Sequence, residues 1–166
     1  MYKLFFVSFF MFLLCINAHS QTLDTINLST LEQQFSDSIA LLNEQNKQLK
    51  SSRDAYNAGL LLLENENYID AIDYFTNAIL IDSVFVVAYL SRAKCYQGPN
   101  YKLAISDYRT AFSLDSTNLQ PLYLIAALQL KSDQVLAKQT YQTIISYNKT
   151  EHKAYSQLGV ISFLVK

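Results

Sequence analysis

The sequence predicts an all-α protein built as a solenoid of helical hairpins, for three reasons. The stretch 68–82 returns at 101–115 with small and large residues in register. A period of about 33 residues is typical of stacked helical hairpins. About half of the 166 residues are apolar, enough for a core, while two prolines and three glycines are too few for the turns of an all-β fold. The pairs that repeat at this spacing include Ala71/Ala104, Phe75/Tyr108, Ala78/Ala111 and Asp82/Asp115.

Residues 1–20 have the pattern of a secretory signal peptide. Lys3 precedes the apolar run 4–16, and the small residues Ala18 and Ser20 stand where a signal peptidase would read them. A helix of that run would rise only about 20 Å, against about 30 Å of bilayer hydrocarbon, which disfavours a membrane anchor. We therefore expect cleavage after Ser20 and export of the mature chain to the periplasm or the cell exterior, as a protein of a bacterial envelope.

The composition of the mature chain disfavours several functions. Removing residues 1–20 takes away Lys3 alone among the charges and leaves 12 basic against 14 acidic groups, a net charge of −2. No basic patch indicates a nucleic-acid partner. Cys95 is then the one cysteine left, so an internal disulfide cannot form, and we expect it to be a small apolar core residue. Lipidation at Cys15 is the minor alternative to cleavage after Ser20.

Residues 21–51 are predicted to form a polar lead-in followed by an N-terminal amphipathic helix over about 30–50. Ser29 or Thr30 suits the position that caps such a helix. The expected role is to cap the first repeat, with a coiled-coil seam to another chain as the alternative. Capping is favoured because the apolar stripe lapses at Gln45 and Asn46, whereas a seam needs several unbroken heptads. The stripe consists of Leu31, Phe35, Ile39, Leu42 and Leu49.

The repeat region is predicted to place one small residue in the middle of every helix, because helices approach closely only where the crossing residue has little side chain. Large aromatic residues follow four positions after each small residue of the second helices, where they should pack between hairpins. The small residues are Gly59, Ala93, Ala126 and Gly159 in first helices and Ala71, Ala104 and Ala137 in second helices; the aromatic residues are Phe75, Tyr108 and Tyr141. The expected helices lie near 53–65, 68–81, 85–97, 100–114, 119–131, 134–147 and 151–165.

These residues resemble the tetratricopeptide repeat over 52–166. The run Ala88-Tyr-Leu-Ser-Arg-Ala-Lys-Cys-Tyr96, followed by 101–115, is similar to one repeat, 55–82 to a second and the weaker unit 122–148 to a third. The resemblance implies about three hairpins plus a terminal helix, and a concave groove lined by first helices. The chain departs from the family where the repeats meet, since Ser83, Ser116 and Lys149 stand in place of the usual proline.

The inventory of reactive residues predicts no enzyme and no cofactor. The mature chain holds one histidine, His152, one cysteine, no Gly-rich phosphate loop and no clustered His and Cys ligands, so catalytic and zinc-binding functions lack their parts. Asp70 and Asp73, three residues apart on a helix, are expected to form a solvated acidic edge.

The groove that the resemblance implies is predicted to hold a segment of a partner protein or peptide. Arg53 and Asn57 lie four residues apart, where some members of the family bind a terminal carboxylate, but Val87, Gln120 and Leu124 replace other polar residues of such a clamp. Packing of the N-terminal helix into the groove is the alternative. The predicted groove residues are Arg53, Tyr56, Asn57, Leu60, Leu63, Val87, Leu90, Ser91, Lys94, Gln120, Tyr123, Leu124 and Ala127, with Tyr56, Leu90 and Tyr123 as exposed anchors.

The last helix is predicted to carry a second surface. Val160, Phe163 and Leu164 point away from the side that packs on the third hairpin, whereas Gly159 should give that side a close approach. The three apolar residues are expected to support a weak contact with a second copy or a partner. This expectation underlies an alternative function, a structural subunit of an envelope assembly joined through its terminal helices.

Overall fold

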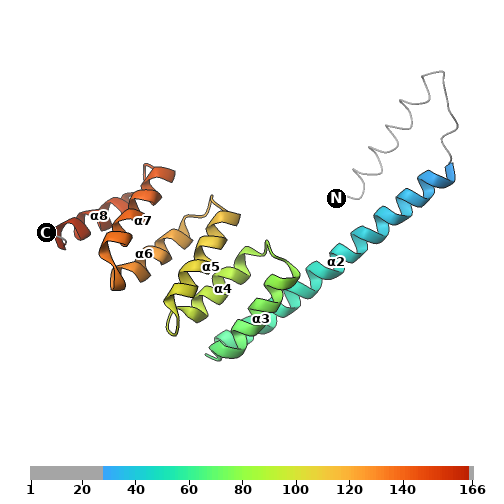
Figure 1. The fold of residues 1–166 in the computed structure, drawn as a ribbon, viewed down its shortest axis with the longest axis horizontal. Helices are drawn as coiled ribbons and strands as arrows, with labels where there is room; N and C mark the ends of the chain where they lie inside the picture. Colours follow the sequence, from blue (N-terminus) through green and yellow to red (C-terminus); the bar gives the residue numbers. More distant parts are fainter. Residues whose placement is uncertain (1–27, 165–166) are drawn as a thin grey trace, which may run out of the picture. The chain divides into compact units, whose positions relative to one another are not determined.

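The structure of the protein is a computed structural model that describes residues 28–164, with the side chains of 29–162. Every element in that part of the chain is an α-helix, which confirms the predicted fold class (Figure 1). The predicted signal peptide and most of the predicted lead-in lie outside the described residues. None of the described helices is long and apolar enough to cross a membrane. The helices are α2 (Leu28–Glu64), α3 (Tyr68–Ile81), α4 (Val86–Tyr96), α5 (Tyr101–Leu114), α6 (Gln120–Ser132), α7 (Gln134–Tyr147) and α8 (His152–Leu164).

The chain divides into two units, Met1–Glu44 and Gln45–Lys166. In the first unit, Ile39 and Leu42 of the predicted stripe are exposed. The capping role of this helix stays a prediction.

The prediction of separate helices over 30–50 and 53–65 is wrong, because α2 runs without a break from Leu28 to Glu64. The segment 50–53 contains neither proline nor glycine, so nothing in it interrupts the helical backbone. Ser52, which could end a helix, instead lies buried within it and donates its hydroxyl to the carbonyl of Ala78 on α3 at 2.9 Å. This bond helps to fasten α2 to its partner helix. The other predicted helices agree with the observed ones to within one or two residues.

The second unit consists of hairpins formed by the end of α2 with α3, α4 with α5, and α6 with α7, followed by α8 (Figure 1). The small and aromatic residues of the second helices are buried as predicted: Ala71, Ala104 and Ala137, with Phe75, Tyr108 and Tyr141, are at most 4% exposed. Cys95 is buried against Ala71 and Phe75, which confirms its place in the core. These contacts fix the spacing of successive hairpins and so the face that their first helices present.

Two glycines in equivalent positions behave differently. A Cβ on Gly59 would lie 2.7 Å from Cε1 of the buried Phe75, so this position needs glycine for the close approach of α2 and α3. Gly159 faces open space, with nothing within 4 Å of an added Cβ. The prediction that Gly159 provides a close approach to the third hairpin is therefore wrong. In each of the three hairpins the second helix carries a buried aromatic residue, and in the first hairpin this residue, Phe75, lies against Gly59. No described residue lies against Gly159 in the same way.

Polar side chains begin the second helix of each hairpin. Asn67 and Asn100 accept hydrogen bonds from the amides of Asp70 and Leu103. The carboxylate of Asp133 accepts from the amides of Val135 and Leu136 at 2.9 and 3.1 Å. Such caps satisfy amides that have no partner within the helix. They place the three second helices alike and keep the repeats in register.

Candidate functional site

The predicted groove face combines exposed polar side chains with half-buried apolar ones. The members from α2, α4 and α6 recur once in every repeat, so equivalent helix positions line up along the array. The exposed members are Arg53, Asn57, Val87, Lys94, Gln120 and Ala127, and the half-buried members are Tyr56, Leu60, Leu63, Leu90, Ser91, Tyr123 and Leu124.

Tyr56 is half-buried, contrary to the prediction of an exposed anchor, because the array supplies it with aromatic neighbours. Its ring centroid lies 5.6 Å from that of Phe75 and 5.1 Å from that of Phe85. Its hydroxyl also accepts a hydrogen bond of 3.4 Å from Ser91 on α4. Tyr56 thus joins α2, α3 and the start of α4, and part of its ring remains accessible. Leu90, the second predicted anchor, is half-buried as well, in the core cluster of the later hairpins.

Tyr123, the third predicted anchor, is held in the same way at the other end of the face. Its hydroxyl donates to the carboxylate of Glu151 at 2.8 Å, its ring lies 6.2 Å from that of Tyr141, and the Nζ of Lys153 lies 5.0 Å from its ring centroid. Burial, followed by the bond to Glu151 and the negative charge of that carboxylate, raises the pKa of Tyr123 to about 12. The phenol therefore remains a neutral donor at physiological pH.

Sequence reasoning missed Glu151 and Lys153 as members of the site. Lys153 takes the place of Gln120 one repeat later and therefore continues the series Arg53, Val87 and Gln120, so the repeat period would have found it. Glu151 precedes α8 and has no equivalent acid in the earlier hairpins. Only the three-dimensional structure shows its contact with Tyr123.

The described groove residues carry more free positive than negative charge. Arg53 and Lys94 are exposed, and Lys153 sits over an aromatic ring, whereas Glu151 is occupied by Tyr123 and by the side-chain amide of Asn148 at 3.0 Å. Arg53 and Asn57 are both accessible on α2. This arrangement suits a ligand that has apolar side chains and carboxylates.

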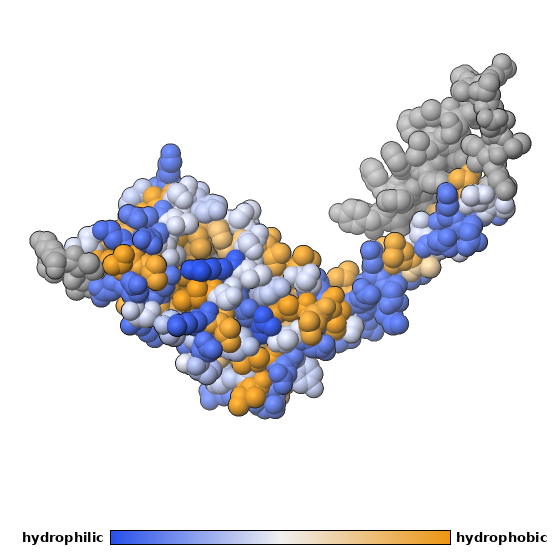
Figure 2. Space-filling model, viewed as in Figure 1, coloured by the Kyte–Doolittle hydropathy of each residue, from blue (hydrophilic) through white to orange (hydrophobic). Residues whose placement is uncertain are grey.

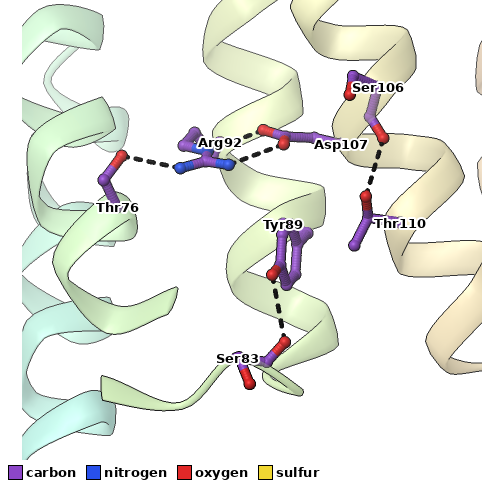
Figure 3. Close-up of polar contacts among 7 residues, drawn as sticks. All are labelled: Thr76, Ser83, Tyr89, Arg92, Ser106, Asp107 and Thr110. Atoms are coloured by element: carbon purple, nitrogen blue, oxygen red, sulfur yellow. Dashed lines mark hydrogen bonds and ion pairs between the residues drawn. The ribbon is translucent and has the colours of Figure 1, made fainter. Parts of the chain in front are cut away.

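A polar junction links the first two hairpins (Figure 3). The guanidinium of Arg92 on α4 donates to both oxygens of Asp107 on α5 at 2.8 Å and to the hydroxyl of Thr76 on α3 at 3.0 Å. The hydrogen bond to Asp107 raises the pKa of Arg92. The junction is largely buried, so it positions helices and offers little surface to a ligand.

The predicted terminal surface is described in part. Val160 is 54% exposed, as predicted, whereas the side chains of Phe163 and Leu164 lie outside the described residues. As for a metal centre, no group of three or more His, Cys, Asp or Glu side chains in the described part of the chain is arranged to hold an ion.

Comparison with known proteins gives sequence relatives that are much longer than this chain. No family model matches it. It is 31% identical over 106 residues to the human protein DnaJ homolog subfamily C member 7, covering 63% of this chain and 20% of that protein. The homologue from Dictyostelium discoideum is 33% identical over 125 residues, covering 72% and 22%. The chain thus spans about a fifth of the length of these relatives.

Solved structures share the fold at low identity. The first TPR domain of Spaghetti (RPAP3), bound to the HSP90 peptide SRMEEVD, has a TM-score of 0.58 at 20% identity, over 70% of this chain and 94% of that one. The Yersinia enterocolitica type III secretion chaperone SycD, in complex with a peptide of the translocator YopD, has a TM-score of 0.60 at 18% identity, over 69% and 94%. The second TPR domain of human RPAP3, in complex with the HSP70 peptide SGPTIEEVD, has a TM-score of 0.55 at 22% identity, over 71% and 98%.

The fold and these likenesses define a helical-repeat protein. Its second unit is a tetratricopeptide-like solenoid of helical hairpins that ends in the additional helix α8.

Proposed function

We propose that the repeat unit is a non-catalytic protein-interaction module that holds a segment of a partner protein on its groove face. The observation that carries this proposal is the pairing of accessible Arg53, Asn57 and Lys94 with half-buried Tyr56 and Tyr123 on one face. Solved proteins of the same fold hold peptides, which supports the same use here. Partly buried aromatic rings suit recognition because little conformational entropy is lost when a ligand covers them.

The ligand we propose is a peptide segment with apolar side chains and at least one carboxylate. Arg53, Lys94 and Lys153 favour negative charge, and Arg53 with Asn57 offers donors for a carboxylate. The peptides SRMEEVD and SGPTIEEVD, bound by structures of the same fold, have this character. Val87 and Leu124 provide no polar donors, so we do not expect a full carboxylate clamp.

Affinity capture tests the proposal. The mature chain and its Arg53→Glu/Lys94→Glu variant serve as baits, with Lys102→Glu/Lys138→Glu as the matched control on exposed positions of second helices. We expect the groove variant alone to lose its bound proteins and to lose binding of labelled SRMEEVD in fluorescence anisotropy. Capture that is equal for all three baits would contradict a function of the groove face.

The second candidate function is that of a structural subunit joined through α8. The exposure of Val160 favours it. Burying Val160, Phe163 and Leu164 would contribute roughly 5–8 kcal/mol against an association cost of about 4–15 kcal/mol, so this surface alone supports a weak contact. Light scattering over a concentration series compares the native chain with Phe163→Asp. A native chain that stays monomeric and equals the variant in solubility would exclude self-association here.

We also propose that the chain is exported after cleavage behind Ser20, in a bacterial envelope. The basic residue Lys3, the apolar run 4–16 and the small residues before Gln21 support this proposal. Intact-mass measurement of the exported protein should give a chain that begins at Gln21. A mass that includes residues 1–20 would contradict the proposal.

A further inference from the structure

A hollow of about 510 Å³ lies on the first hairpin, on residues that do not include the groove positions of α2. It opens to the surface and has an apolar floor. Leu61 is 62% exposed and Tyr74 45% exposed, so both are accessible. Apolar patches of this kind interrupt the hydrophilic surface of the repeat unit in Figure 2. The lining residues are Ala58, Leu61 and Leu62 from α2 and Asp70, Asp73 and Tyr74 from α3.

The later hairpins show what covers this position of a first helix. Cys95, Leu128 and Ile161 take the place of Leu61 in the successive first helices α4, α6 and α8. Cys95 and Ile161 are at most 2% exposed, and Leu128 is half-buried. Cys95 packs on the second helix of the preceding hairpin through Ala71, and Leu128 and Ile161 belong to the core cluster that contains the later second helices. In the later hairpins a second helix therefore covers the position equivalent to Leu61, whereas Leu61 itself is exposed.

The charges around the hollow are particular to this end of the array. Asp70 and Asp73 stand where α5 has Leu103 and Ser106, and Asp54, one turn before Ala58 on the same face of α2, stands where α4 has Ala88. Within the described part of the chain, no Lys or Arg side chain pairs with any of these three aspartates. Acidic residues around an apolar surface complement a ligand in which basic side chains flank an apolar side chain.

We propose that this face binds a helix of a partner protein whose one apolar or aromatic side chain enters the hollow between flanking Lys or Arg side chains. This surface is separate from the groove face, and the proposal does not depend on the groove's function. The helix would take the place that a second helix occupies in the later hairpins, while its basic residues would pair with Asp54, Asp70 and Asp73.

Helix α7 supplies a template for the probe, because it packs in the same cluster as Ile161. The probe is a synthetic peptide of residues 134–147 with Gln139→Lys and Gln142→Lys, which together with Lys138 places three positive charges at positions that are exposed in the array. The matched control peptide carries Glu at the same three positions. Isotope-labelled full-length protein is titrated with each peptide, up to about 1 mM because weak binding is expected, and the amide resonances are followed by NMR.

We expect the basic peptide to shift the amides of Leu61, Asp70 and Tyr74, with binding weakened by raising the salt from about 0.05 to about 0.5 M. Asp70→Asn and Asp73→Asn should each weaken binding about threefold. The groove variant Arg53→Glu/Lys94→Glu should keep binding, which separates this proposal from the proposed function. The proposal would be overturned by an absence of shifts at these amides, by equal binding of the acidic peptide, or by shifts confined to α6 and α8, where the peptide would be displacing α7.

Discussion

The carboxylate of Asp107 receives two parallel hydrogen bonds of 2.8 Å from the guanidinium of Arg92, across the two helices of the second hairpin. The pair is largely shielded from water, because the side chain of Asp107 is 9% exposed and that of Arg92 is 17% exposed. Since Arg92 also donates to Thr76 in the preceding hairpin, one side chain ties three helices together (Figure 3). Such a pair fixes geometry, and its loss leaves a charge without its partner.

Removing one member of the pair should therefore destabilise the repeat unit. We expect Asp107→Ala and Arg92→Leu each to lower the free energy of unfolding by about 3 kcal/mol, because the remaining charge stays desolvated. Urea unfolding followed by circular dichroism measures the effect. Losses below about 0.5 kcal/mol would place this pair with ordinary surface ion pairs.

Replacing both members should restore most of the stability. The equivalent positions in the next hairpin are Ile125, which is 2% exposed, and Thr140, whose hydroxyl lies 2.7 Å from the side-chain oxygen of Gln129 and 3.1 Å from the carbonyl of Leu136. The double variant Arg92→Ile/Asp107→Thr copies these two residues and removes both charges, and its new threonine can donate to the carbonyl one turn earlier in its own helix. We expect its stability to lie within about 1 kcal/mol of the native chain, because replacing a buried ion pair by well-packed residues is often neutral. A double variant as unstable as the single ones would show that this hairpin cannot repack.

Gly59 and Gly159 provide a matched pair of substitutions. Gly59→Ala should lower the free energy of unfolding by about 1–2 kcal/mol, because the new methyl group must displace the buried ring of Phe75, at a cost larger than the gain in helix propensity. Gly159→Ala meets open space and should raise stability by about 0.5–1 kcal/mol. Thermal unfolding of both variants checks the opposite signs. Equal effects would contradict the different surroundings of the two glycines.

Glu66 is a place where a substitution should stabilise the chain. It has a φ of 59° in the turn after α2, and the amide of Asn67 donates to the carbonyl of Leu62 across it. Glycine is preferred in this left-handed conformation at the end of a helix. Glu66→Gly should raise the free energy of unfolding by about 1 kcal/mol, whereas Glu64→Gly, within the last turn of α2, should lower it by about 0.5–1 kcal/mol. Chemical denaturation of the two variants makes the comparison, and a loss of stability in both would contradict it.

The repeat period predicted the core because it relates residues by position. Ala71 and Phe75 could be assigned to the interior since their equivalents in two other hairpins are of the same kind, and both are fully buried. The prediction failed before residue 53, where the chain has no equivalent in the later hairpins. The sequence pattern predicts separate helices over 30–50 and 53–65, whereas α2 continues through Ser52, whose hydroxyl bonds to the carbonyl of Ala78 on the next helix.

The groove face was harder to predict than the core. The spacing placed Tyr56 and Tyr123 on the face, and their neighbours Phe75 and Tyr141 belong to the repeating aromatic residues. Their further contacts with Phe85 and Glu151 could not be predicted, because neither residue type recurs at that position of the repeat. Asp107 aligns with Tyr74 and Thr140, so the period alone did not mark it as the partner of Arg92. Paired charges of this kind are properties of one hairpin, and the three-dimensional contacts reveal them.

The contact between Tyr123 and Glu151 gives a prediction about alkaline pH. The pKa of Tyr123 is raised to about 12 in the folded chain, chiefly by burial and then by the bond to Glu151, while an unfolded tyrosine titrates near 10. Because the folded state binds the phenolic proton more tightly, this contribution to stability is fully present below about pH 10 and is lost as the pH rises toward about 12. Glu151→Gln removes the negative charge, so we expect the pKa of Tyr123 to fall part of the way toward 10. Burial should keep the pKa above that value. Ultraviolet titration of the native chain and of Glu151→Gln, each compared with its own Tyr123→Phe derivative, isolates this phenol from the other tyrosines. A difference spectrum of the native chain that titrates near pH 10 would contradict the raised pKa of Tyr123, and an unchanged titration in Glu151→Gln would show that the charge of Glu151 does not contribute to it.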